Sequence, residues 1–439
     1  MTLDRREFLQ GLAGLSGAAA LLHDPASSGI EHVVVVMMEN RSFDHLLGWL
    51  PNSDGRQSGL RYPDASGTYH PTHPLAPDFV GCGHVDPDHS YIGGRIQYGR
   101  GAMDGFLREY DDDQYPIGYY TETARPFLSA LARSYTTLDR SFCSILGPTF
   151  PNRFFLHGAQ TDRLMNTVAV ATMPTICDRL EREGVSHGYY YSNLPFLAFW
   201  GLKYLPFSQP YSRFLFDALT GRLPAVSFVD PKFTLLDDGT GNDDHPHADI
   251  RAGDAFLSQA FHAVAAGPDW RSTVFIVTYD EWGGFFDHVP PPRADAPNAL
   301  DPDLSGGKAR LGFRVPTIVA SPWSRGWALF PRVHHGTFDH TSILKLIEWR
   351  WGLAPLTARD ASPDVLNLAS VLDFDNPRVP VPWLPRPVAP PPTACAEAAT
   401  AAGMARQSGA PPDNNWQALL DSGLLTSWPI YIDAFGRRP

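Results

Sequence analysis

Apolar runs without alternation recur along the chain and indicate its architecture. Residues 32–38, with the sequence HVVVVMM, are apolar on both faces, and residues 274–279 and 315–320 repeat this pattern. Such runs are typical of central strands in a parallel sheet, because helices cover both faces of that sheet. Weaker strand candidates lie at 188–191 and 225–229.

Between these runs, apolar residues return every three or four positions, as in amphipathic helices. One helix is predicted at 43–50, with Ser42 as its N-cap. The others are predicted at 125–136, 175–183, 253–266 and 341–351. Strands that alternate with helices predict an α/β fold, in which a doubly wound, mostly parallel sheet is sandwiched by helices.

Composition divides the chain into three parts. An Arg-Arg pair at 5–6 precedes a Gly/Ala-rich, weakly apolar stretch at 11–22, which is the pattern of a twin-arginine signal. We therefore expect residues 1–28 to be a signal read by the twin-arginine export machinery, and the protein to be periplasmic or secreted. An amphipathic first helix is the alternative. Residues 29–375 form one large predicted domain, and 376–439 a Pro-rich C-terminal tail with a short helix.

Net charge and cysteine usage restrict the partners and the cross-links. The 439 residues carry a formal net charge of -12, whereas nucleic-acid binders normally present a basic surface, so no nucleic-acid partner is expected. Four cysteines allow three disulfide pairings, and their spacing neither chooses among these nor excludes buried free thiols. The cysteines are Cys82, Cys143, Cys177 and Cys395.

Two of the predicted strands end in acidic pairs. The strand at 32–38 is followed by Glu39 and Asn40, and the next apolar run by Asp280 and Glu281. Ligands of open α/β sheets collect at the carboxyl ends of strands, and carboxylates placed close together there repel one another unless a cation binds them. The pattern predicts one divalent metal ion with oxygen ligands, which favours Ca²⁺, Mg²⁺ or Mn²⁺. Solvent-facing helix caps are the alternative for these acids.

Thr149 is the candidate nucleophile. It lies between Pro148 and Pro151, directly before a helix-compatible segment. A hydroxyl that attacks phosphorus needs a fixed turn and activation by a metal or a base. Backbone amides at a helix N-terminus can then hold phosphate oxygens. An ordinary structural turn is the alternative.

Four histidines are candidates for acid–base catalysis. Each directly follows an Asp, and imidazole titrates in the range needed to protonate a leaving oxygen near neutrality. Spacing does not show which of them is the general acid. They are His89, His245, His288 and His340.

Four segments carry a resemblance to a known family. In chain order they are ENRSFDH at 39–45, GPTFPNR at 147–153, TYDEWGGFFDHV at 278–289 and DHTS at 339–342. They resemble the signature segments of the phosphoesterase family, which holds bacterial phospholipases C, plant non-specific phospholipases C and acid phosphatases.

The resemblance implies an alkaline-phosphatase-like core and a phosphoesterase catalytic domain at 29–375. It places the four histidines around the phosphate. It also implies a metal held by Glu39, Asn40, Asp280, Glu281 and the Thr149 hydroxyl.

We therefore expect an exported, metal-dependent hydrolase of phosphate esters. Phospholipase C, which releases diacylglycerol and a phosphorylated head group from a phospholipid, is favoured, with transient contact of the membrane surface. An acid phosphatase acting on small monoesters and a catalytically inactive exported binding protein are the alternatives.

Two features bear on the substrate. Trp282 stands where phospholipase members commonly have His, which leaves the substrate preference open. The aromatic residues of 189–216 either form an apolar surface for acyl chains or belong to the core.

Overall fold

The computed structural model describes residues 23–110, 113–235, 239–326, 330–395 and 416–430. The Arg-Arg pair and most of the Gly/Ala-rich stretch of the predicted signal lie outside these residues.

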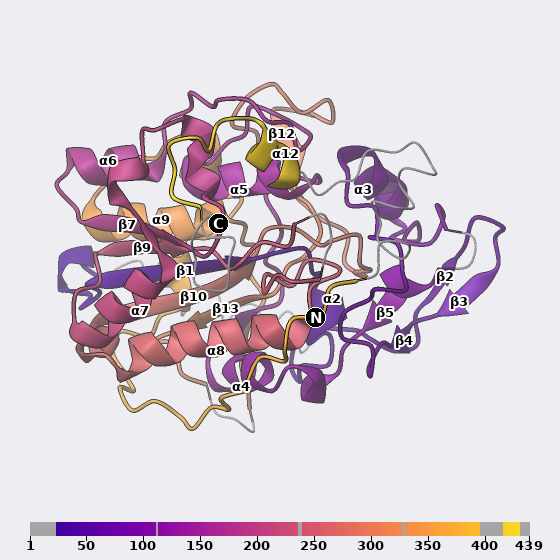
Figure 1. The fold of residues 1–439 in the computed structure, drawn as a ribbon, viewed down its shortest axis with the longest axis horizontal. Coiled ribbons are helices and arrows are strands. Elements are labelled where there is room, and N and C mark those ends of the chain that lie inside the picture. Colours follow the sequence, from indigo (N-terminus) through magenta and orange to yellow (C-terminus); the bar gives the residue numbers. More distant parts are fainter. Residues whose placement is uncertain (1–22, 111–112, 236–238, 327–329, 396–415, 431–439) are drawn as a thin grey trace, which may run out of the picture.

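Within the described residues, eight strands form one sheet that has helices on both faces (Figure 1). Five of the seven neighbouring strand pairs are parallel, and the two pairs made by β13 are antiparallel. In order across the sheet the strands are β14 (Arg332–His334), β6 (Thr136–Leu138), β13 (Thr317–Ala320), β10 (Thr273–Tyr279), β1 (His32–Met38), β9 (Val226–Val229), β7 (His187–Tyr191) and β8 (Ser208–Pro210).

The helices form two layers, with α4, α7 and α8 on one face of the sheet and α5, α6, α9 and α12 on the other (Figure 1). The described helices are α2 (Phe43–Leu47), α3 (Tyr91–Tyr98), α4 (Pro126–Ser134), α5 (Thr149–Gly158), α6 (Ile176–Arg182), α7 (Tyr211–Thr220), α8 (Ile250–Ala266), α9 (Thr341–Trp351), α10 (Ala358–Ala361) and α12 (Trp416–Asp421). Three short strand pairs lie outside the main sheet: β2 (Arg61–Pro63) with β3 (Tyr69–Pro71), β4 (His73–Pro74) with β5 (Gly118–Tyr119), and β11 (Arg293–Asp295) with β12 (Lys308–Arg310).

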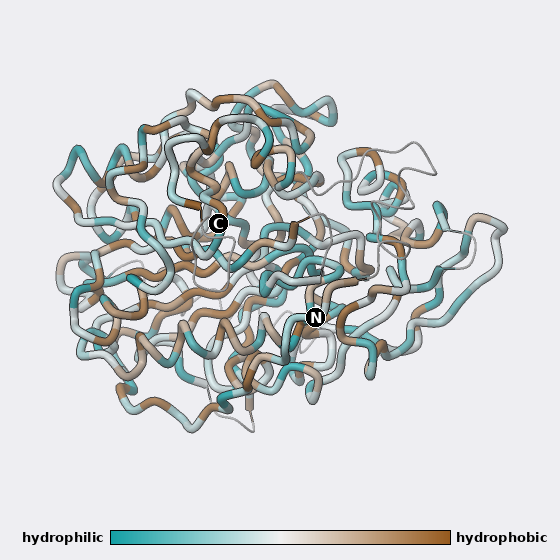
Figure 2. The backbone as a smooth tube through the Cα atoms, in the orientation of Figure 1, coloured by the Kyte–Doolittle hydropathy of each residue, from teal (hydrophilic) through white to brown (hydrophobic). Residues whose placement is uncertain are grey.

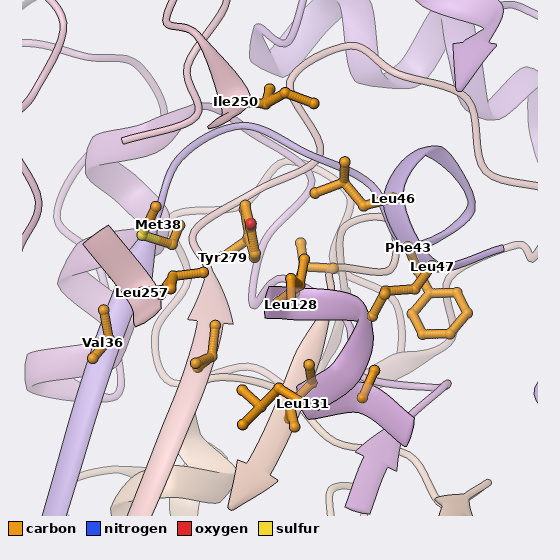
Figure 3. Packing of buried hydrophobic residues seen from close by; sticks show 14 of the residues in the cluster. Val36, Met38, Phe43, Leu46, Leu47, Leu128, Leu131, Ile250, Leu257 and Tyr279 are labelled. Atoms are coloured by element: carbon orange, nitrogen blue, oxygen red, sulfur yellow. The ribbon is translucent and has the colours of Figure 1, made fainter. Parts of the chain in front are cut away.

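Strand β1 is buried on both faces. Val36 and Met38 belong to the same buried cluster as Leu128 of α4 and Leu257 of α8 (Figure 3), while alternate residues of β1 join the cluster of α5 and α9. β-branched side chains favour extended backbone, and each fully buried Val contributes about 1.5–3 kcal/mol. The apolar run therefore contacts both helix layers from one strand, and Figure 2 shows brown, hydrophobic stretches running through the middle of the molecule.

The predicted fold class is confirmed, because the sheet is mostly parallel and covered by helices on both faces. Two details differ. The strand expected at 315–320 begins at Thr317 and runs antiparallel to β10, since Pro316 has no N–H to donate and an apolar run does not encode strand direction. The helix expected at 125–136 ends at Ser134, because Tyr135 is extended and the β-branched residues that follow form β6.

One disulfide joins Cys82 to Cys395, so it links the segment before α3 to the C-terminal tail. Cys143 and Cys177 are buried free thiols. No helix in the described part of the chain is long and apolar enough to cross a membrane.

Candidate active site

The two acidic pairs lie side by side at one edge of the sheet. Strands β1 and β10 are parallel neighbours whose last residues, Met38 and Tyr279, are paired in register. Glu39 and Asp280, the residues that follow them, therefore lie next to each other at the carboxyl ends of the two strands. The backbone N–H of Asn40 donates to Asp280 Oδ1 at 2.9 Å, which ties the two strand ends together.

The cluster carries more negative than positive charge. Glu39, Asp280 and Glu281 are fully buried. One guanidinium faces them: Arg153 Nε donates to Glu39 Oε1 at 2.7 Å and lies 3.7 Å from Asp280 Oδ2. Burial and the neighbouring Asp280 charge raise the pKa of Glu39 and of Glu281 well above the usual carboxyl range.

Three oxygen atoms of this cluster have no hydrogen-bond partner among the described residues: Asn40 Oδ1, Asp280 Oδ2 and Glu281 Oε1. Leaving a buried oxygen unsatisfied costs on the order of 1–3 kcal/mol. Carboxylate and amide oxygens are the ligands that hard divalent cations take. The donor chemistry thus fits the divalent metal ion that the sequence predicts. Among the described residues, the groups of three or more whose ligand atoms all lie within 4.8 Å of one another are Asp86 with His89 and His245, and Asp44 with Asp287 and His288.

Thr149 is the first residue of α5 and is buried, and its loop is held by the side chain of Asn152. Asn152 Nδ2 donates to the carbonyls of Gly147 at 2.8 Å and of Pro148 at 3.2 Å. Residues four apart share one face of a helix, so Thr149 lies one turn before Arg153, the residue that contacts Glu39. The helix therefore presents the threonine on its face toward the acidic cluster.

His89 and His245 lie together next to the acidic cluster. His89 Nε2 is 3.1 Å from Asn40 Nδ2 and 3.8 Å from Glu281 Oε1. The rings of His89 and His245 meet edge to face with centroids 5.8 Å apart, and His245 Nε2 is 3.9 Å from a carboxylate oxygen of Asp86. Burial and the nearby His89 lower the pKa of His245 well below its ordinary value.

His340 supports the end of β10. Its ring Nε2 is 2.9 Å from the carbonyl oxygen of Tyr279, the residue before Asp280. The ring is buried, and burial lowers the pKa of His340. This histidine contacts the backbone that carries the acidic pair.

His288 belongs to a second charged cluster. Its Nδ1 is 2.5 Å from Asp44 Oδ2, and its Nε2 is 3.6 Å from Asp54 Oδ1. Arg314 pairs with Asp44 and with Asp287, at 2.9 Å in each case. Burial opposes the charged ring, but the hydrogen bonds to Asp44 and Asp54 outweigh it and raise the pKa of His288 to about 9. Its charge at neutral pH is thereby fixed.

Two sequence features that bear on the substrate are part of the core. Tyr189, Phe196 and Trp200 are buried in one cluster, so this part of the aromatic stretch belongs to the core, while Phe216 at its end is 47% exposed. Trp282 is also fully buried, and its Nε1 donates to Gln97 Oε1 at 2.7 Å. The indole thus has a packing role beneath α3.

Three residues at the site were missed from the sequence. Arg153 had a signal, since it follows Thr149 by one helical turn in the GPTFPNR segment. Asp86 precedes His89 by three residues, but its proximity to His245 depends on the fold. Trp416, whose Nε1 is 3.5 Å from Glu39 Oε2, is 377 residues away in the chain and had no sequence signal.

Comparisons with known proteins identify the family of the chain. The model of the Phosphoesterase family matches residues 30–354. Non-specific phospholipase C1 of Arabidopsis thaliana is 34% identical over 373 residues, which cover 76% of this chain and 69% of the relative. Phospholipase C B of Mycobacterium tuberculosis is 33% identical over 424 residues, which cover 79% of this chain and 78% of the relative.

A solved structure of a protein in the alkaline phosphatase superfamily from Vibrio parahaemolyticus is similar over 82% of this chain and 79% of its own, with 12% identity and a TM-score of 0.37. No statement about function follows from that likeness. The family match covers most of the chain and includes the acidic pairs and Thr149. The chain therefore belongs to the phosphoesterase family, and it is a hydrolase that acts on phosphate esters.

Proposed function

We propose that the protein is an exported, metal-dependent phospholipase C that hydrolyses phospholipid to diacylglycerol and a phosphorylated head group, with Thr149 as the nucleophile. The names of its relatives support the reaction class. The observation that carries the proposal is the set of three unsatisfied oxygens on Asn40, Asp280 and Glu281, beside the helix that begins at Thr149.

The ligands proposed for one divalent metal ion, Ca²⁺, Mg²⁺ or Mn²⁺, are all oxygens. Bound there, the ion would supply positive charge that favours loss of the threonine proton and stabilises the phosphoryl oxygens. Arg153 holds Glu39 in place by its contact with Oε1. The proposed ligands are Glu39, Asn40, Asp280, Glu281 and the Thr149 hydroxyl.

The Thr149 hydroxyl gives up its proton to solvent and its oxygen attacks phosphorus. The bond from phosphorus to the diacylglycerol oxygen breaks as a protonated histidine donates its proton to that oxygen, which leaves the ring neutral. His89 and His245 are the histidines that lie beside the cluster, whereas His340 contacts the β10 backbone. Water then attacks the phosphothreonine from the opposite side and gives a proton to the neutral histidine. The bond from phosphorus to the Thr149 oxygen breaks, and the head-group phosphate is released. Phosphoryl transfer of this kind depends mainly on positioning and on stabilisation of charge.

The decisive experiment compares two substrates. Purified full-length protein is incubated with phosphatidylcholine and with p-nitrophenyl phosphate, each with and without a chelator. We expect diacylglycerol and phosphocholine from the lipid, and loss of both products in the chelator. Release of p-nitrophenol without any diacylglycerol from several phospholipids would contradict the lipase assignment.

An acid phosphatase acting on monoesters is the second candidate. The observation that favours it is the burial of the aromatic residues at 189–204, because buried rings form no surface for acyl chains. The transient membrane contact proposed for the lipase would then need another surface. The two-substrate experiment separates these candidates.

The same proposal includes export and domain division. Residues 1–28 act as the twin-arginine signal, 29–375 as the phosphoesterase catalytic domain and 376–439 as the tail. The protein would then be periplasmic or secreted. Replacing both arginines by Lys (Arg5→Lys with Arg6→Lys) should retain the protein in the cytoplasm of a bacterial host, which cell fractionation measures.

A further inference from the structure

The C-terminal segment reaches the predicted metal site through one side chain. Trp416 opens α12, is 1% exposed, and donates its indole N–H to Glu39 Oε2 at 3.5 Å. The other oxygen of the same carboxylate, Oε1, accepts from Arg153. The two oxygens of Glu39 thus have different donors, so the orientation of the carboxylate is fixed from both sides.

The ring of Trp416 also packs against the elements that carry the nucleophile. It stacks on Phe233 with a centroid distance of 3.8 Å and meets Phe150, the residue after Thr149, edge to face at 5.1 Å. The guanidinium of Arg153 lies over the Phe233 ring at 4.7 Å and near the Trp416 ring at 5.8 Å. One indole therefore contacts the first turn of α5 and the ion pair of Glu39.

The segment that holds Trp416 is anchored independently of the site. Leu419, Leu425 and Trp428 are buried in the same cluster as α5 and α9, and Figure 1 shows α12 beside α5. Tyr191 Oη donates to the carbonyl oxygen of Pro429 at 2.7 Å. Such anchoring holds the indole against Glu39 without support from the site itself.

We propose that Trp416 is a positioning residue of the active site, which orients Glu39 as a metal ligand and braces the first turn of α5. This inference rests on the proposed function, because it takes Glu39 as a ligand. Groups that hydrogen-bond metal ligands set their orientation, and their loss typically weakens metal affinity about 10–100-fold. The C-terminal segment then contributes to the active site by holding Glu39 in the orientation for binding the metal.

The test uses two conservative variants of the full-length protein, Trp416→Phe and Trp428→Phe. Both tryptophans are buried in the same segment and both indoles donate a hydrogen bond, but Trp428 Nε1 donates to the carbonyl oxygen of Gly201 at 3.1 Å. Phenylalanine keeps a ring and removes the N–H in each case. The two variants therefore differ in whether the lost bond served Glu39.

Each protein is freed of metal with chelator and titrated with Mn²⁺, Mg²⁺ and Ca²⁺ by calorimetry without substrate. We expect the cation that wild type binds most tightly to bind Trp416→Phe about 10-fold more weakly, the lower limit for such contacts, because the bond to Glu39 is long. Trp428→Phe should bind it like wild type. In assays at saturating metal, Trp416→Phe should lower kcat with little change in KM.

Wild-type affinity in Trp416→Phe, or an equal loss in Trp428→Phe, would overturn the role of Trp416 and leave the proposed function standing. If wild type itself bound none of the three cations, both the metal site of the proposed function and this inference would fail.

Discussion

Two acidic clusters follow the same two strands, and they differ in how their charges are matched. Glu39 and Asp280 come directly after β1 and β10, and Asp44 and Asp287 follow a few residues later in the same two segments. Both clusters are buried. The two clusters therefore have similar burial and similar positions in the fold, and they differ mainly in how their charges are balanced.

In the second cluster, cations match the acids. Arg314 pairs with Asp44 and Asp287, and the charged ring of His288 pairs with the other oxygen of Asp44. The ligand atoms of Asp44, Asp287 and His288 lie close enough to hold a metal, but the guanidinium already supplies positive charge there. This cluster locks α2 to the segment after β10.

In the first cluster, Arg153 faces the carboxylates of Glu39, Asp280 and Glu281, and three oxygens remain unsatisfied among the described residues. Buried charge without a partner is costly, so the protein retains it where a ligand completes the site. The difference teaches that acidic residues alone do not indicate chemistry. Unsatisfied oxygens beside a rigid loop that carries a candidate nucleophile are a stronger indication of a catalytic site.

Removing the proposed nucleophile should have the largest effect on activity. Thr149→Ala deletes the attacking oxygen and leaves both charged clusters intact, so the fold should persist while turnover falls at least ~10³-fold. Thr149→Ser keeps a hydroxyl and should retain much of the activity. Turnover is measured with p-nitrophenyl phosphate and with phosphatidylcholine. Activity of a folded Ala variant within a few-fold of wild type would favour direct attack by water.

Breaking the matched cluster should reduce stability. Arg314→Met leaves the buried Asp287 carboxylate without its guanidinium partner and Asp44 with His288 alone, which should cost about 3–5 kcal/mol of unfolding free energy. Urea denaturation in the presence of chelator measures it. Arg251→Met is the matched control, since its ion pair with Asp249 is at the surface and should cost less than about 1 kcal/mol. Equal losses of unfolding free energy in the two variants would mean that the buried ion pairs of Arg314 stabilise the fold no more than a surface ion pair does.

The sequence predicted those parts of the fold that depend on local pattern. The unbroken apolar runs that form β1 and β10 are visible without tertiary information. The helix predicted at 125–136 extended into the first residue of the strand Thr136–Leu138, because a strand of three residues is too short to show its period and this one closely follows a helix. The direction of the strand Thr317–Ala320 depends on the path that the chain takes between β10 and β13, and the pattern of apolar residues within a strand carries no information about that path.

The residues of the candidate site also fall into those that the local sequence pattern reveals and those that depend on tertiary packing. The acidic pairs were found because carboxyl ends of neighbouring parallel strands share one edge. His288 was grouped with the other histidines because each follows an Asp, and the sequence does not show that Arg314 and Asp44 hold this one in the second cluster. The contact of Trp416 with Glu39 spans 377 residues and depends on the packing of the tail.

Metal removal should separate the clusters by stability. A cation bound only by the folded protein stabilises it by about 2.7 kcal/mol at a concentration 100 times its Kd. Chelator should therefore lower the Tm of wild type and of Asp287→Asn, whose substitution leaves the first cluster intact. Asp280→Asn should be inactive and its Tm insensitive to chelator. An unchanged Tm in wild type, with elemental analysis showing that the metal was removed, would contradict the metal site.

The smallest expected effect is a pH dependence that belongs to the second cluster. The pKa of His288 is raised from 6.5 to about 9 in the folded protein, chiefly because its bonds to Asp44 and Asp54 outweigh burial. A raised folded pKa stabilises the protein fully below pH 6.5, and this contribution is lost as the pH rises through about 9. His288→Gln removes the titrating ring, so its unfolding free energy should lie below that of wild type at pH 6 and approach it above pH 9. The gap at low pH should be on the order of 1 kcal/mol, because a ring that is 20% exposed is partly screened by solvent.

Urea denaturation of both proteins across this pH range measures the difference in unfolding free energy, and chelator in the buffer removes any contribution from the proposed metal site. A gap that stayed constant with pH would mean that His288 acts through packing, and that Arg314 alone matches the acids of this cluster.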